Sequence, residues 1–187
     1  MKNTLAITAV IFTLAFVSLP VVWSDSDFRW GELDEYKHRS SGVAAAIDPV
    51  YQEECGSCHM AYSPGLLPSS SWMKLMSGLE NHFGDNAELD AETQKSVTTF
   101  LLSNSADRSD YRRSQKFSRS IQNDNVPIRI SETPYFRHEH DEIPGRMVTG
   151  NPEVKSFSHC NACHTKAEQG LFNEHDVRIP GFGKWDD

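Results

Sequence analysis

Residues Cys55-Gly56-Ser57-Cys58-His59 form a Cys-x-x-Cys-His run, and the run recurs once, as Cys160-Asn161-Ala162-Cys163-His164. This spelling is typical of a c-type haem attachment site. On a helical turn, positions i, i+3 and i+4 share a face, so Cys55, Cys58 and His59 can all address one planar macrocycle. Two thioethers would hold the haem edge while the imidazole binds the iron. The second run predicts a second haem in the same way.

Zinc knuckles and thioredoxin-like redox pairs also use Cys-x-x-Cys, but neither needs a His directly after the second Cys. With 8 His in 187 residues, the chance of His at both places is (8/187)², about 0.2%. A zinc ribbon leaves roughly 15 to 20 residues between its cysteine pairs, whereas the two cysteine pairs of this chain are separated by the whole of residues 59–159. We therefore predict two covalent haems, with thioethers from Cys55 and Cys58 and from Cys160 and Cys163, and with His59 and His164 as proximal iron ligands.

The N-terminus has the pattern of a secretory signal peptide. Lys2 precedes an apolar run over residues 5–16, and a small-residue site ends at Ser24. We expect cleavage after Ser24 and export to the periplasm. The alternative is an uncleaved anchor, because residues 5–23 approach the length of about 20 that spans a bilayer. Export agrees with the cysteine usage, since both motifs together consume all four and leave none for a structural disulfide.

Length and charge bound the remaining possibilities. Removing residues 1–24 leaves 163 residues (187 − 24), enough for one ordinary domain or two small ones. The formal net charge of −8 becomes −9 when Lys2 is removed. This acidic balance argues against a nucleic-acid partner.

The first haem needs a second axial ligand, and His82 is the best candidate. A helix can begin at Ser69, Ser70 or Ser71 and end at Gly84. Its apolar stripe comprises Trp72, Leu75, Met76, Leu79 and Phe83. His82 lies on the same stripe, so we predict it as the distal ligand. Met76, Met73 and an open site are the alternatives.

A further helix is predicted over residues 91–104, with Asp90 as its cap. The following segment, residues 106–125, is polar and locally basic, with Arg108, Arg112, Arg113, Lys116 and Arg119. We interpret it as a solvated linker. A docking surface for an acidic partner and a clamp on haem propionates are the alternatives.

The second distal ligand is predicted upstream of its motif. Thr133-Pro134 is a good helix start, and Phe136, His140 and Ile143 then share one face of a helix that Pro144-Gly145 closes. This geometry favours His140, with His138 and His175 as alternatives. The C-terminal tail, residues 170–185, mixes turn residues with aromatic ones and is expected to cover the second haem.

Several runs together resemble the small soluble dihaem cytochrome c family. They are Cys55 to Tyr62, Leu66-Leu67-Pro68, Trp72, Asn81 to Gly84, Thr133-Pro134, His140 to Ile143, the second haem motif and Arg178-Ile179-Pro180. The resemblance covers most of residues 50–180. It implies two unequal haem domains, the first similar to a class I cytochrome c and the second largely irregular. It also implies two axial histidines on each iron, and a small monohaem c-type cytochrome as partner. By position, His59 and His82 would serve one haem, and His164 and His140 the other.

The sequence thus predicts a mainly α-helical periplasmic electron carrier rather than an enzyme. The expected parts are a signal peptide (1–24), an N-terminal haem domain (25–105), a linker (106–125) and a C-terminal haem domain (126–187). Expected partners are another cytochrome and a membrane-bound electron donor. The alternatives are a dihaem redox enzyme such as a peroxidase, which needs an open distal site, and a haem subunit of a membrane complex.

Overall fold

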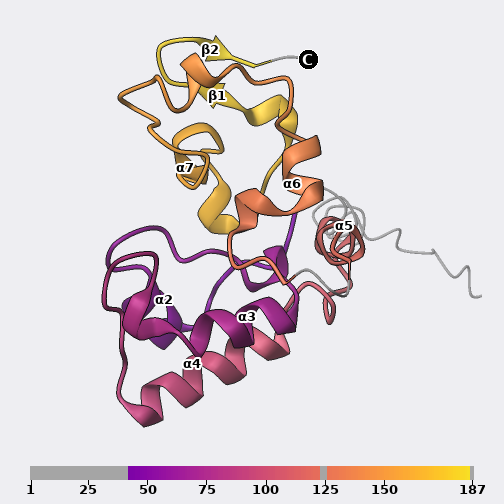
Figure 1. The fold of residues 1–187 in the computed structure, drawn as a ribbon. Helices are drawn as coiled ribbons and strands as arrows, with labels where there is room; N and C mark the ends of the chain where they lie inside the picture. Colours follow the sequence, from indigo (N-terminus) through magenta and orange to yellow (C-terminus); the bar gives the residue numbers. More distant parts are fainter. Residues whose placement is uncertain (1–41, 123–125, 186–187) are drawn as a thin grey trace, which may run out of the picture.

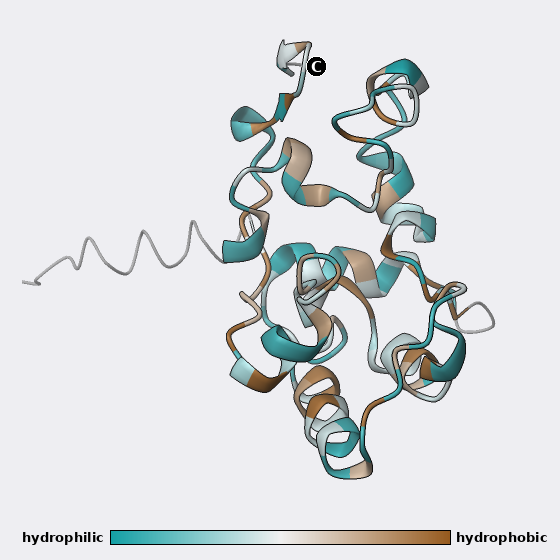
Figure 2. Ribbon diagram, turned by 90° about the vertical axis from the view of Figure 1, so that its left-hand side faces the viewer, coloured by the Kyte–Doolittle hydropathy of each residue, from teal (hydrophilic) through white to brown (hydrophobic). Residues whose placement is uncertain are grey.

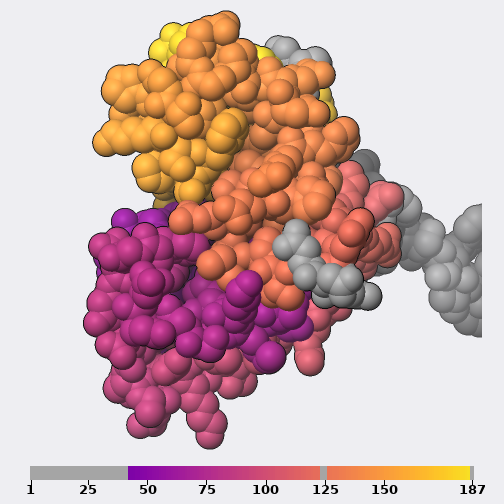
Figure 3. Space-filling model, in the orientation of Figure 1, coloured from indigo at the N-terminus to yellow at the C-terminus, as the bar shows by residue number. Residues whose placement is uncertain are grey.

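The protein is described by a computed structural model that covers residues 42–122 and 126–185. The predicted signal peptide lies outside these residues. The described chain is mainly helical, as predicted. Helices α2, α3 and α4 form one half of the molecule, and α6, α7 and a short hairpin form the other (Figure 1). A notch separates the two halves on one face (Figure 3).

Two helices of the N-terminal half begin at an aspartate cap, and the second of them begins where the sequence predicts. Helix α2 (Pro49–Cys55) is capped by Asp48, whose carboxylate accepts a hydrogen bond of 2.8 Å from the backbone N–H of Tyr51. Helix α4 (Ala91–Ser103) is capped by Asp90, which accepts from the N–H groups of Glu92 and Thr93. Both caps satisfy donors that the helix itself leaves unpaired.

Helix α3 (Ser69–Met76) is shorter than predicted and is capped differently. Ser77 turns its hydroxyl onto the carbonyl of Lys74, Gly78 follows, and the chain continues as a 3₁₀ turn, η2 (Leu79–Asn81). Such a side-chain bond competes with the helical ladder. At the other end none of the serines is the cap. The carboxylate of Asp107 instead accepts from the backbone N–H of Ser69 at 2.8 Å and from its hydroxyl at 2.7 Å.

The first core lies among α2, α3 and α4. Its buried members are Ala46, Tyr51, Leu67, Trp72, Met76, Leu79, Val97 and Leu101. Trp72 is 3% exposed, and its indole N–H donates to the carbonyl of Pro64 in the 3₁₀ turn η1 (Pro64–Leu66) at 2.8 Å. Hydrophobic residues alternate with polar ones along these short helices (Figure 2), because each buries only one face.

The expected solvated linker is instead a packed segment, which corrects that part of the prediction. Residues 112–120 form helix α5 (Arg112–Ser120), whose Phe117 is 4% exposed. Its ring meets Tyr135 edge to face, with centroids 4.9 Å apart. Phe117 belongs to a second core made by Val43, Leu66, Ala106, Tyr135, Phe136, Ala167 and Phe172. This core therefore joins side chains from before, within and after the segment.

Helix α6 (Pro134–His138) begins at the predicted Thr133 cap, whose hydroxyl accepts from the N–H of Phe136 at 3.3 Å. The helix ends before the predicted Pro144. Nδ1 of the His140 ring donates to the Phe136 carbonyl, which would accept from the backbone N–H of His140 if the helix continued. The remainder has little regular structure: η3 (Ile130–Glu132), η4 (Gly145–Met147), α7 (Cys160–Cys163), η5 (Ala167–Gln169), η6 (Glu174–Asp176), β1 (Arg178–Ile179) and β2 (Gly183–Lys184). The two strands pair antiparallel. Among the described residues, no helix has the length and apolar character to cross a membrane.

Candidate haem sites

His59 and His82 face each other at the first motif. Their ring centroids lie 6.2 Å apart and their planes differ by 25°. A metal bound by two imidazole nitrogens at about 2 Å each would hold the ring centres roughly 6 Å apart. The spacing therefore suits one iron between the two rings, although the chain brings His82 there from a turn and not from the predicted helix.

The His59 ring is oriented by its own loop. Its Nδ1 lies 2.7 Å from the carbonyl of Met60, and since a carbonyl only accepts, this nitrogen carries the proton. Nε2 is then the nitrogen with a free electron pair for a metal, as in other His ligands with a backbone partner. Tyr62 packs beside the ring, with centroids 4.9 Å apart.

A tight turn holds His82. Its backbone N–H donates to the carbonyl of Asp85 at 2.7 Å, and the Asp85 N–H returns a bond of 3.2 Å. The turn needs Phe83 at φ 58° and Gly84 at φ 109°, a region that favours glycine. The guanidinium of Arg129 covers the exposed Phe83 ring at 3.9 Å from its centroid. The turn thus places His82 without help from a helix.

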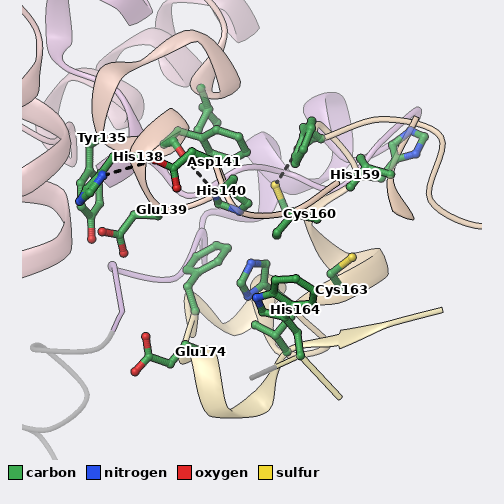
Figure 4. Close-up of a pocket in the computed structure, with 18 of the residues that line it drawn as sticks. Tyr135, His138, Glu139, His140, Asp141, His159, Cys160, Cys163, His164 and Glu174 are labelled. Atoms are coloured by element: carbon green, nitrogen blue, oxygen red, sulfur yellow. Dashed lines mark hydrogen bonds and ion pairs between the residues drawn. The ribbon is translucent and has the colours of Figure 1, made fainter. Parts of the chain in front are cut away.

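His140 and His164 form a second pair, with ring centroids 6.1 Å apart and planes at 71°. They line a cavity of about 310 Å³ together with Cys160 and Cys163 (Figure 4). That volume lies in the range of about 300–1,000 Å³ found for cofactor sites. Much of the remaining wall is apolar: Leu66, Phe117, Ile130, Phe136, Val148, Val154, Phe157, Phe172, Val177, Ile179 and Trp185. The predicted cover from the C-terminal tail is therefore present in this wall.

Aromatic rings fix both members of the second pair. The His140 ring stacks on Phe136 at 3.9 Å between centroids, and its Nδ1 donates to the Phe136 carbonyl at 2.8 Å. Phe157 meets His140 edge-on at 5.9 Å, and Phe172 meets His164 at 5.4 Å. As at His59, the hydrogen bond from Nδ1 leaves Nε2 of His140 for a metal.

The alternative distal ligands lie in less suitable places. The His138 side chain is 79% exposed, and its Nδ1 lies 3.9 Å from the Asp141 carboxylate. His175 is 74% exposed beside Glu174. Met73 is 55% exposed, whereas Met76 is buried within the first core. His82 and His140 are favoured because their rings already face His59 and His164. Their role as distal ligands stays a prediction.

Burial sets the protonation of these groups. It lowers the pKa of His82 and His140, and lowers that of His164 to about 4, with the facing His140 as a second cause. All three imidazoles are therefore neutral at pH 7, which metal binding requires. Burial raises the pKa of Cys55 and of Cys160 to about 11. A thioredoxin-like pair has a lowered cysteine pKa, so the thiols do not resemble one.

The two motifs are only partly helical, contrary to the single-turn geometry expected for the first. Helix α2 ends at Cys55, so Cys58 and His59 lie beyond it. In the second motif Cys160 and Cys163 form the one-turn helix α7, and His164 is its C-terminal cap. All four cysteines are unpaired, and no three His, Cys, Asp or Glu side chains of the described chain form a site for a bare metal ion.

One contact near the sites was not predicted from the sequence. The Tyr62 hydroxyl donates to the carbonyl of Ser158, 96 positions away, at 2.8 Å and so joins the two halves. This contact has no local signal. Arg113 from α5 was named only as one of five basic residues, with a clamp on haem propionates as an alternative role for their segment. The structure places Arg113 in the wall of the second cavity, one turn before the buried Phe117.

Comparison with known proteins agrees with this geometry. The family model described as "Dihaem cytochrome c" matches residues 51–172, well over half of the chain. The chain belongs to the dihaem cytochrome c family. It therefore binds two c-type haems and is an electron-transfer haemoprotein. No curated protein matches the sequence.

Solved structures of dihaem cytochromes c are similar over most of the described chain. A dihaem cytochrome c from Shewanella baltica is 44% identical and has a TM-score of 0.62, with 74% of this chain and 97% of that chain covered. The dihaem cytochrome c from Rhodobacter sphaeroides is 42% identical and has a TM-score of 0.62, with 70% and 100% covered. A second Rhodobacter sphaeroides structure is 40% identical, has a TM-score of 0.56 and covers 68% and 99%.

Proposed function

We propose that this dihaem cytochrome c is a periplasmic electron carrier in which each iron has two histidine ligands. The observation that carries the proposal is the pair of facing imidazoles at each motif, with centroids 6.2 Å and 6.1 Å apart. His59 and His82 would hold one haem, and His164 and His140 the other. Thioethers from Cys55 and Cys58 and from Cys160 and Cys163 would attach them.

The bound haems supply iron(III)/iron(II) cycling, and the protein's residues control access and potential. His82 and His140 fill the positions that an oxygen- or peroxide-binding enzyme would keep open. Phe136, Phe157 and Phe172 pack against the second pair of rings and hold them in place. These features support a carrier over the dihaem peroxidase alternative.

The first half is proposed as the class I-like haem domain, and the second as the irregular one, with boundaries near residues 105 and 126. The proposed partner is another cytochrome, such as a small monohaem c-type cytochrome, with a membrane-bound electron donor. The pattern of residues 1–24 supports export. Intact mass of the exported protein tests this: a mature chain that begins near Asp25 supports it, and a membrane-bound form that retains Lys2 favours the membrane-complex alternative.

Carbon monoxide binding separates the carrier from the enzyme. Two histidines complete the six ligands of each haem iron and leave no position for carbon monoxide, so the reduced full-length protein should show no carbon monoxide shift in its Soret band. Peroxide turnover with a reduced small cytochrome as electron donor should also be at background. Stoichiometric carbon monoxide binding together with peroxide turnover would overturn the proposal in favour of the enzyme.

A further inference from the structure

The charges in the wall of the second haem cavity are unequal. Among the described residues that line it, Arg113 is the one Arg or Lys, whereas four are acidic: Glu139, Asp141, Glu142 and Glu174. The family match does not assign Arg113 a role. Its position raises the question of what a cation does beside His140 and His164.

Arg113 is held in a fixed place. Its Nη1 donates to the Tyr135 hydroxyl at 3.1 Å and to the Glu139 carboxylate at 3.4 Å. The Arg113 side chain is 21% exposed, and Tyr135 is 8% exposed. Tyr135 and Glu139 both lie beside His140 at the cavity (Figure 4). The guanidinium is therefore a partly desolvated charge at the cavity wall, where water screens it less than at the surface.

Arg113 and both axial candidates lie at one cavity. Its wall includes Arg113, His140 and His164, together with Glu139, the carboxylate that Arg113 contacts. The Glu139 side chain is 34% exposed against 21% for Arg113, so water screens the carboxylate more than the guanidinium. The carboxylate therefore offsets the positive charge incompletely at this cavity.

We propose that the positive charge of Arg113 raises the reduction potential of the second haem, and that the negative charge of Glu139 lowers it. Reduction adds one electron and lowers the charge at the site by one unit, so a fixed positive charge favours the reduced form. Tyr135 and Glu139 hold the guanidinium where this effect is exerted. The inference rests on the proposed ligation by His140 and His164.

Spectroelectrochemical titration of the full-length, two-haem protein tests the inference. The component that His140→Ala displaces identifies the second haem. For Arg113→Gln we expect its ratio of reduced to oxidised form, at a fixed applied potential, to fall by about tenfold, which equals 59 mV for a one-electron couple. Glu139→Gln should shift the same component in the opposite direction. Arg113→Lys keeps the charge and should stay within about threefold of the unmutated protein.

Arg119→Gln is the matched control. Arg119 lies on the same helix, is exposed, and bonds Gln115, so its removal changes the total charge equally without touching the cavity. The inference is overturned if Arg113→Gln shifts the potential of the second haem no more than Arg119→Gln does. The proposed ligation still stands in that case, provided the oxidised spectrum stays low-spin. An equal fall in Arg113→Lys also overturns the inference. A high-spin iron in the unmutated protein overturns the proposed ligation, and the inference with it.

Discussion

Removing the hydroxyl of Tyr62 should loosen the joint between the two halves of the molecule. This hydroxyl donates to the Ser158 carbonyl at 2.8 Å, and Cys160 Sγ lies 3.6 Å from the same carbonyl. Burial, with Cys160 as a smaller cause, raises the pKa of Tyr62 to about 12, so the hydroxyl is a donor throughout the neutral range. Tyr62→Phe removes this bond and keeps the ring beside His59.

The cost follows from one neutral hydrogen bond in a half-buried place. Such a bond contributes about 1 kcal/mol net, and an acceptor left dry costs up to about 3 kcal/mol. The Ser158 carbonyl is only partly buried, so we expect a loss of about 1–1.5 kcal/mol in the free energy of unfolding. Tyr62→Ala should cost more, because it also removes the ring that packs on His59.

Guanidinium unfolding followed by the Soret band measures the change. Tyr51→Phe is the matched control, since the Tyr51 hydroxyl donates to the Tyr62 carbonyl at 2.7 Å within the first half. Loss of the Tyr51 hydroxyl should leave the absorption of the second haem unchanged. Tyr62→Phe, in contrast, should change the absorption of the second haem at denaturant concentrations below global unfolding. A stability equal to that of the unmutated protein in Tyr62→Phe would refute the argument that this bond joins the halves.

Three further predictions concern single residues. Asp107→Ala should lower the free energy of unfolding by about 1–2 kcal/mol, as for other lost helix caps. Burial acts to raise the pKa of Asp107, but the hydrogen bonds from Ser69 and Ser105 outweigh it and lower the pKa. The contribution of Asp107 to the free energy of unfolding is therefore complete above the unfolded pKa of about 3.9 and is lost as the pH falls through the lower folded pKa. Unfolding curves measured over a series of pH values test this. A stability difference between the variant and the unmutated protein that is largest in acid would contradict it. Gly170→Ala should cost at least about 2 kcal/mol, because residue 170 has φ 74° and a Cβ there would lie 2.3 Å from the Val43 carbonyl oxygen; thermal unfolding at an unchanged temperature would disprove this clash. His82→Ala and His140→Ala should each open one haem to carbon monoxide in the reduced state, and an unchanged spectrum for His140→Ala would transfer its role to His138 or His175.

Local signals predicted much of this molecule. Asp90 and Thr133 were predicted at helix starts, and each accepts the hydrogen bond expected of a cap. The motifs themselves indicated two c-type haems. These features depend on neighbours within four positions in the chain, which the sequence displays directly.

Features that depend on distant contacts or on competing local bonds were predicted less well. Helix α3 was expected to reach Gly84, but the Ser77 hydroxyl bonds a helical carbonyl and ends it early, so His82 arrives through a turn. The basic segment 106–125 looked solvated because its charges outnumber its apolar residues, yet Phe117 packs α5 into the second core. Asp107 caps a helix 38 positions away.

Low-temperature electron paramagnetic resonance of the oxidised full-length protein tests the central claim most directly. Two histidines on each iron predict two low-spin iron(III) signals and no high-spin signal. The optical spectrum of the same sample should lack the far-red charge-transfer band of a sulfur-to-iron(III) bond. A high-spin component equal to one haem, or that far-red band, would contradict the assignment of His82 and His140 as the distal ligands.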